Sequence, residues 1–174
     1  MDMAILLSIK PEHCKLITCG KKLIDVRKTA PKLETPFKVY IYETQGKTQR
    51  ISAIAELHPG RKKVIGEFIC DRVYRYSTGN VEGVDISDAD MMKLSCLTKD
   101  ELISREFSAA HRDFCTYNVG LYGWHISNLI IYDKPKELKE FVGLRKTKFG
   151  YESTKMTKPP QSWRYVKYRG VDNA

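Results

Sequence analysis

The chain has 174 residues, which is long enough for one domain with a sizeable buried core. Its 42% hydrophobic and 29% charged residues are close to globular averages, which argues against a disordered or low-complexity protein. Its 30 Lys and Arg residues outnumber the 21 Asp and Glu residues, and the formal net charge of +9 favours a polyanionic partner such as RNA, with DNA as the alternative.

The five cysteines form no Cys-x-x-Cys pair and no Cys/His series at zinc-finger spacing. We therefore expect reduced thiols, no metal site and no cofactor. The apolar run within residues 1–10 is far too short for a signal peptide or a membrane span, so we expect a cytoplasmic protein with no membrane partner. The zinc-deaminase, Walker and G-x-G-x-x-G patterns are also missing, which disfavours metal-activated deamination and nucleotide-driven activity.

The first predicted elements are a strand and a short helix. The apolar run Ala4–Ile9 predicts a buried strand that ends before Pro11. Pro11 suits the first position of a helix and Gly20 suits the left-handed residue that ends one. A helix is therefore predicted at residues 11–19.

The next strand carries an unusual group of charges. With alternation starting at Ile24, Ile24 and Val26 face the core. Asp25 and Arg27 then share the other face. Lys22 has the parity of the core face, so it can join Asp25 and Arg27 only if it lies in the turn before the regular strand begins.

Two further strands are predicted before the middle of the chain. Residues 37–42 alternate in polarity, and residues 64–76 give the longest strand signal in the sequence. Gly66 inside the longer run indicates a bulge or a close backbone approach. Residues 44–63 are predicted to form a loop, with a short helix at about 51–57.

From Ser87 the hydrophobic period becomes helical. The stretch Thr98-Lys99-Asp100-Glu101 fits a capping box before Leu102. The sequence therefore predicts a helical insertion at about residues 87–120.

The last part of the chain returns to strand character. Residues 122–132 predict a strand, residues 135–141 one or two helical turns, and residues 163–168 a final strand. Residues 146–160 are basic and contain prolines, and they are predicted to be irregular. Lys and Arg far outnumber acids across residues 134–169, which form a basic C-terminal segment.

Together these elements predict an α+β fold that is mostly β. One helix lies between the first two strands, and a helical insertion precedes the penultimate one. Such a set closes most naturally into a small barrel of mixed strands within a single domain spanning residues 1–174.

Two stretches carry a resemblance to a known family. Leu6-Leu7-Ser8-Ile9-Lys10-Pro11 and Gly20-x-Lys22-x-x-Asp25-x-Arg27 resemble the start of an ASCH domain, whose signature is G-x-K-x-x-E-x-R. The resemblance continues through later segments that are similar to bacterial and phage members, namely Gly66-Glu67-Phe68, Tyr122-Gly123-Trp124-His125-Ile126 and Pro159-Pro160-Gln161-Ser162-Trp163. Asp25 stands where the family usually has glutamate.

The resemblance implies a PUA-like β-barrel with a cleft lined by the signature residues, and a role in binding RNA or a modified nucleoside. One branch is similar to amidohydrolases that deacetylate acetylcytidine with the signature lysine, a threonine at the position of Asp25 and a distant glutamate. Another branch has been described as ribonucleases. If this chain is an enzyme, it is expected to be a metal-independent hydrolase with Lys22, Asp25 and Glu67 as catalytic residues.

The chemistry of the signature residues allows two interpretations. Lys22, Asp25 and Arg27 can form an ordinary solvated ion cluster, which is common and contributes little. Alternatively, Arg27 binds a phosphate or a base edge, Lys22 supplies a charge or a base, and Asp25 orients the lysine or accepts an exocyclic amine.

Three residues of the later strand are further candidates for ligand contact. Trp124 is either a core anchor or a platform for an unpaired base, and core packing is the better-supported reading. His125 and Ser127 share one face by alternation, so they line the cleft together or form a structural hydrogen-bonded pair. Glu67 is either the distant catalytic carboxylate or an ordinary outward-facing strand residue.

The principal functional hypothesis is thus a module that binds RNA at Lys22, Asp25 and Arg27, with the basic C-terminal segment guiding the backbone. The alternative is a small hydrolase of a nucleoside amide or an RNA phosphodiester that uses the signature lysine. A weaker third hypothesis is a protein-interaction role.

Overall fold

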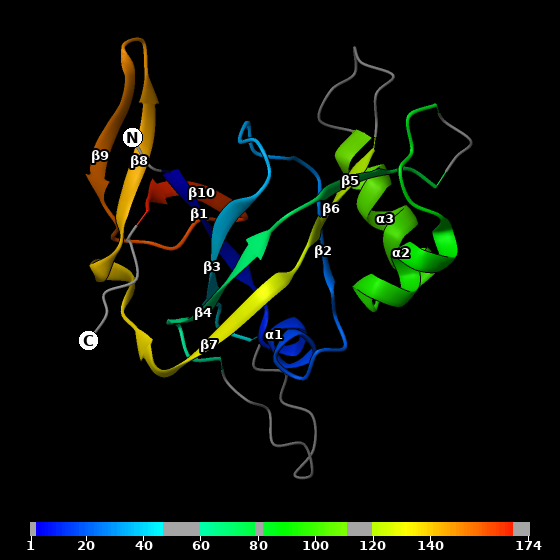
Figure 1. The fold of residues 1–174 in the computed structure, drawn as a ribbon, viewed down its shortest axis with the longest axis horizontal. Helices are drawn as coiled ribbons and strands as arrows, with labels where there is room; N and C mark the ends of the chain where they lie inside the picture. Colours follow the sequence, from blue (N-terminus) through cyan, green and yellow to red (C-terminus); the bar gives the residue numbers. More distant parts are fainter. Residues whose placement is uncertain (1–2, 47–59, 79–81, 111–119, 169–174) are drawn as a thin grey trace. The chain divides into compact units, whose positions relative to one another are not determined.

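The computed structural model describes residues 3–46, 60–78, 82–110 and 120–168 (Figure 1). The chain divides into two compact units, each assembled from discontinuous segments. Unit 1 contains Met1–Lys15, Phe37–Ile69 and Asn128–Ala174, and unit 2 contains Leu16–Pro36 and Cys70–Ser127. The assignment of residues 1–174 to one domain stays a prediction.

Unit 1 is built on a seven-stranded sheet with the strand order β7-β4-β3-β1-β10-β8-β9 (Figure 1). Its strands are β1 Met3–Ile9, β3 Phe37–Glu43, β4 Val64–Cys70, β7 Ser127–Lys136, β8 Val142–Thr147, β9 Gly150–Lys155 and β10 Trp163–Lys167, with a 3-10 turn, η1 Leu138–Glu140, before β8. β1 lies parallel to β3 and antiparallel to β10. A parallel pair requires a crossover connection, and the helix α1 Pro11–Thr18 begins that crossover.

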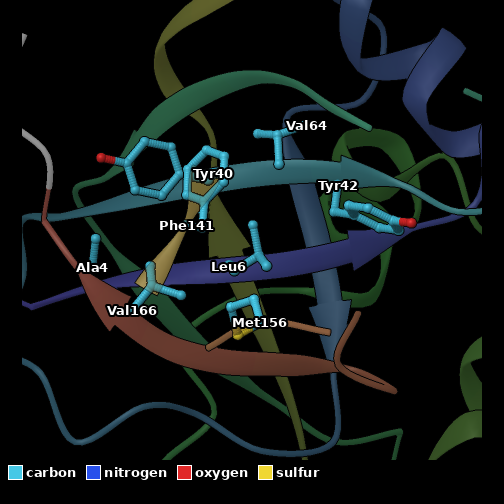
Figure 2. Close-up of a cluster of buried hydrophobic side chains, with 8 residues drawn as sticks. All are labelled: Ala4, Leu6, Tyr40, Tyr42, Val64, Phe141, Met156 and Val166. Atoms are coloured by element: carbon cyan, nitrogen blue, oxygen red, sulfur yellow. The ribbon is translucent and has the colours of Figure 1, made fainter. Parts of the chain in front are cut away.

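Both faces of β1 are buried, which explains its continuous apolar run. Ala4 and Leu6 point into the cluster drawn in Figure 2, and both are 0% exposed. Ile5 and Leu7 alternate to the other face and are equally buried. The cluster of Figure 2 takes its members from four strands, from the segment before β8 and from the residue after β9, namely Ala4, Leu6, Tyr40, Tyr42, Val64, Phe141, Met156 and Val166.

In the described residues, unit 2 contains a three-stranded antiparallel sheet, two helices and the end of α1. The strand β6 Leu121–His125 lies between β2 Ile24–Arg27 and β5 Val73–Tyr76. The helices are α2 Asp88–Ser95 and α3 Lys99–Ala110, which confirms the helical insertion. The core of the unit joins sheet and insertion through Ile24, Val26, Tyr76, Ile86, Met91, Leu97, Leu102 and Leu121.

The helix signals in the sequence correspond to real caps. Thr98 and Glu101 form the predicted capping box: the Glu101 amide donates to the Thr98 hydroxyl, and the Thr98 amide donates to the Glu101 carboxylate at 2.8 Å. Gly20 adopts φ +70° after α1, which confirms the left-handed residue predicted there.

Two predicted long strands are each two strands in different sheets. The run 64–76 separates into β4 and β5, and the run 122–132 separates into β6 and β7. At the first break Arg72 lies between β4 and β5, and its carbonyl accepts a hydrogen bond from the His125 amide of β6 at 2.9 Å. Just after the second break, which lies at residue 126, Asn128 of β7 has φ +47°. Hydrophobic periodicity does not report which strand is the hydrogen-bonded partner, so it cannot reveal such a change.

Residues 146–160 were predicted to be irregular, and this is wrong for residues 146–155. β8 and β9 form an antiparallel hairpin in which Thr147 pairs with Gly150. Gly150 has φ +125°, a conformation that side chains rarely adopt. The Lys148-Phe149-Gly150 stretch was a turn signal that the proline content of the following residues obscured.

The described strands form two sheets and not one closed ring, so the closed PUA-like barrel stays a prediction. The short helix predicted at 51–57 lies outside the described residues. None of the helices in the described part of the chain has the length and apolar character of a transmembrane segment.

Substitution of Gly66 by alanine is expected to lower the free energy of unfolding by about 1–3 kcal/mol. A Cβ atom at this position would lie 2.3 Å from the backbone oxygen of Ile130, so β4 and β7 would have to move apart. Urea denaturation measures the change, with the exposed β9 substitution Ser153→Ala as control. Equal stability of the two variants would contradict the close backbone approach.

Candidate functional site

The turn after α1 places Lys22 immediately before β2. The amides of Lys21 and Lys22 both donate to the Leu16 carbonyl, at 2.9 and 3.0 Å. These hydrogen bonds satisfy a carbonyl in the last turn of α1. β2 begins at Ile24, so Lys22 lies in the turn, as the sequence required for it to join Asp25.

The same turn is held against the C-terminal end of α2. The Leu23 amide donates to the Leu94 carbonyl at 2.8 Å, and the Lys22 ammonium donates to the Ser95 carbonyl at 2.8 Å. The Cys96 thiol donates to the Lys21 carbonyl at 3.3 Å. A cation beside the last carbonyls of a helix is electrostatically favourable, so Lys22 also acts as a cap of α2.

Strand alternation divides β2 as the sequence predicted. Ile24 and Val26 enter the core of unit 2. Asp25 and Arg27 share the other face, where the Arg27 Nε donates to Asp25 Oδ2 at 2.6 Å. The second oxygen of Asp25 lies 3.9 Å from the Lys22 Nζ atom. One carboxylate therefore lies between two cations.

The three charged side chains are shielded from water to different degrees. Those of Lys22 and Asp25 are 2% and 6% exposed, whereas that of Arg27 is 15% exposed. Solvated surface ion clusters are far more exposed, so the interpretation as an ordinary surface cluster is wrong. Arg27 is the member through which a ligand in solution can reach the group.

Burial lowers the pKa of Lys22 below the ordinary value of 10.5. The charge of Asp25 acts in the opposite direction, while the cations Arg105 and Arg27 lower the pKa further. The sequence alone left the sign open, because Arg27 and Asp25 oppose each other. Desolvation of the Lys22 ammonium is the largest effect, so the pKa of Lys22 is lowered.

A second polar group lies at the junction of β6 and β7. His125 Nδ1 lies 2.6 Å from Asp71 Oδ1, a residue that the sequence analysis missed. Burial raises the pKa of the Asp71 carboxyl, but hydrogen bonds from His125 and Ser127 lower it by more. The pKa of Asp71 is therefore below its ordinary value. The carboxylate therefore orients the imidazole, and Asp71 brings His125 and Ser127 together as a hydrogen-bonded set.

Trp124 is 0% exposed and pairs in register with Asp25 on β2. A stacking platform needs an accessible ring face, so this tryptophan acts as a core anchor in the described structure. It supports the backbone of Asp25 from the neighbouring strand.

Glu67 belongs to unit 1, whereas Lys22, Asp25 and Arg27 belong to unit 2. Its carboxylate contacts the Lys38 ammonium at 2.6 Å and accepts a hydrogen bond from the Tyr132 hydroxyl at 2.5 Å. Burial alone would lower the pKa of Lys38, but the hydrogen bond and charge of Glu67 raise it. Glu67 thus has cation and hydroxyl partners of its own.

Within the described residues, no three His, Cys, Asp or Glu side chains come together in an arrangement that could hold a metal ion. The four cysteines of this part of the chain, Cys14, Cys19, Cys70 and Cys96, are free thiols.

Substitution of Asp25 by asparagine is expected to cost about 3–5 kcal/mol of unfolding free energy, because two shielded cations lose the carboxylate that lies between them. Urea denaturation measures the loss. The control is Glu152→Gln, which removes one carboxylate from an exposed pair with Arg145 and should change stability by no more than about 0.5 kcal/mol. A loss at Asp25 as small as the control's would show that the cluster is solvated.

The fold is similar to that of a crystal structure of ASCH from Zymomonas mobilis, with a TM-score of 0.57, 17% sequence identity and coverage of 94% of this chain and 87% of that chain. Crystal structures of two single-residue mutants of the Zymomonas protein also match, and each match covers 94% of this chain. The first has a TM-score of 0.47 and 15% identity and is covered to 90%. The second has a TM-score of 0.45 and 16% identity and is covered to 88%. Comparison with family models and with curated proteins gave no match. The first similarity confirms the resemblance inferred from the residues: the chain has a mixed α/β, mostly stranded, ASCH-like fold.

Proposed function

We propose that the protein is a PUA-like domain that binds RNA at Lys22, Asp25 and Arg27. The observation that carries the proposal is the 2.6 Å contact between Arg27 Nε and Asp25, which fixes a partly exposed guanidinium on a rigid strand. A guanidinium has five N–H donors in one plane, and this contact uses the one on Nε. The terminal nitrogens of the same group match the oxygens of a phosphate or the edge of a base.

The charge balance of the cluster supports an anionic ligand. Two cations and one carboxylate leave a net positive charge, in a chain whose formal net charge is +9. Lys22 holds Asp25 from the buried side, and Asp25 in turn orients Arg27. The ligand then contacts a preorganised group and loses little binding energy to ordering side chains.

His125 and Ser127 supply further polar contacts in this proposal. His125 is 29% exposed and is oriented by Asp71, so its ring can hydrogen-bond a base without first losing rotational freedom. Trp124 has no ligand contact here, because its ring is fully buried. The basic C-terminal segment adds sequence-independent attraction for the backbone.

The change Arg27→Ala is expected to weaken binding of a mixed-sequence, single-stranded 20-nucleotide RNA by about 1–3 kcal/mol, or roughly 5- to 150-fold. Fluorescence anisotropy at several salt concentrations measures this, and the wild-type affinity should fall steeply with salt.

The matched control for this experiment is Arg61→Ala. Arg61 is also an ion-paired arginine, 3.8 Å from Glu43, but it belongs to unit 1. Both changes remove one positive charge. An Arg27→Ala protein that remains folded and binds as well as the Arg61→Ala protein would rule out the proposed site.

Hydrolysis is the second candidate function, and the lowered pKa of Lys22 favours it. A lysine amine that loses its proton more readily can accept one from water during attack on an amide. Asp25 would then handle protons beside it. Glu67 is already paired with Lys38, so a role for it would require that contact to open.

If this second function holds, the purified protein should deacetylate N4-acetylcytidine. Turnover, followed chromatographically, should then disappear in Lys22→Ala and in the similarly shaped Lys22→Met, and persist in Lys21→Ala, which alters the exposed neighbour. Activity that survives both Lys22 changes would remove this mechanism. Absence of turnover in the wild type would remove acetylcytidine as the substrate.

A further inference from the structure

One face of the unit 1 sheet carries aromatic and lysine side chains side by side. Val166 of β10 pairs with Gly143 of β8, and Lys146 of β8 pairs with Tyr151 of β9. Because paired residues share a face and alternate residues return to it, these registers define a nine-residue set across three strands. The set is Trp163, Tyr165 and Lys167 of β10, Val142, Leu144 and Lys146 of β8, and Tyr151, Ser153 and Lys155 of β9. We call it the aromatic-lysine face.

The three aromatic rings of this face form a continuous row. Tyr151 and Tyr165 meet edge to face with ring centroids 5.5 Å apart, and Tyr165 meets Trp163 in the same way at 5.3 Å. All three remain partly exposed. By contrast, the core pair Tyr40 and Phe141 meets at 5.0 Å with both residues only 2% exposed. The row is thus held in place by its own contacts while the rings stay accessible.

The lysines of the aromatic-lysine face are not neutralised by acids on the same face. Lys146, Lys155 and Lys167 are all exposed. The one acid of the β8–β9 hairpin, Glu152, pairs with Arg145 and therefore lies on the opposite side of the sheet. On the hairpin, alternation has separated a purely basic face from a face on which Arg145 and Glu152 balance.

The tip of the β8–β9 hairpin also carries an aromatic residue next to a lysine. Phe149 is 100% exposed and follows the exposed Lys148. Figure 1 shows β8 and β9, in orange, as a hairpin that extends past the end of β10. A fully exposed phenylalanine beside cations has no packing role within the described residues.

We propose that the aromatic-lysine face binds single-stranded nucleic acid. Unpaired bases stack on accessible aromatic rings, and lysines along the same strands attract the phosphates. A duplex keeps its bases stacked inside, so it offers phosphates to the lysines but no ring face to the aromatic row. The face therefore distinguishes unpaired from paired polynucleotides.

This inference shares its ligand class with the proposed function but depends on different residues. Arg27 and Lys22 belong to unit 2, whereas every residue of the aromatic-lysine face belongs to unit 1. Loss of binding on changing one set and not the other will therefore separate the two proposals.

The first test uses intrinsic fluorescence. The chain has two tryptophans, of which Trp124 is fully buried and Trp163 lies on the aromatic-lysine face. Titration with a 12-nucleotide oligouridine should quench part of the emission as bases stack on the row. A duplex RNA of the same length should bind less tightly and leave the emission unchanged. Quenching by both, or by neither, would overturn the proposal.

The second test compares neighbouring residues on opposite faces of β8. In fluorescence anisotropy with the oligouridine, Lys146→Gln should weaken binding and reduce the slope of log affinity against log salt by about 0.7. Arg145→Gln removes the same charge from the opposite face and should change affinity by less than about twofold. Equal losses for the two variants would mean that only net charge matters, which contradicts a defined face.

The third comparison isolates stacking. Tyr151→Ala should weaken binding by about 5- to 150-fold, while Tyr151→Phe, which keeps the ring, should retain wild-type affinity. Both variants can be checked for folding by thermal denaturation. If Tyr151→Ala binds normally and Arg27→Ala does not, the face is excluded and the proposed function stands. The reverse result would exclude the Arg27 site and leave the face.

Discussion

The burial of Asp25 between two cations is the constraint on which the candidate site depends. A carboxylate that is 6% exposed is costly unless it is paired, and Arg27 at 2.6 Å supplies the close partner. Lys22 is equally shielded and needs partners of its own, which it finds in Asp25 and the Ser95 carbonyl. Removing Asp25 takes the shared carboxylate from both cations.

This requirement connects the turn after α1 with the helical insertion. The Leu23 amide and the Lys22 ammonium donate to the last carbonyls of α2, and the Lys21 carbonyl accepts from the Cys96 thiol, so the insertion contributes directly to the position of Lys22. The insertion is therefore part of the site's construction. The same contacts give Lys22 a structural role that coexists with a functional one.

Strand alternation organises both proposed binding surfaces by the same physical means. On β2 it sends Ile24 and Val26 into the core and keeps Asp25 beside Arg27. On the β8–β9 hairpin it separates Lys146 and Tyr151 from Arg145 and Glu152. In each case a period of two sorts a mixed sequence into two faces of different chemistry.

The sequence by itself determined the helix ends of this protein. Pro11, Gly20 and the Thr98–Glu101 capping box marked helix ends correctly, because caps depend on residues within one turn. The sequence also set the condition that Lys22 must lie in the turn before β2 to join Asp25, and the structure meets it. Only the tertiary structure decided which strand pairs with which, since hydrogen-bonded partners come from distant segments. That is why the two breaks, at residues 71–72 and 126, were missed. The partners Asp71 and Ser95 and the direction of the Lys22 pKa shift likewise depend on burial and contacts that no local pattern contains.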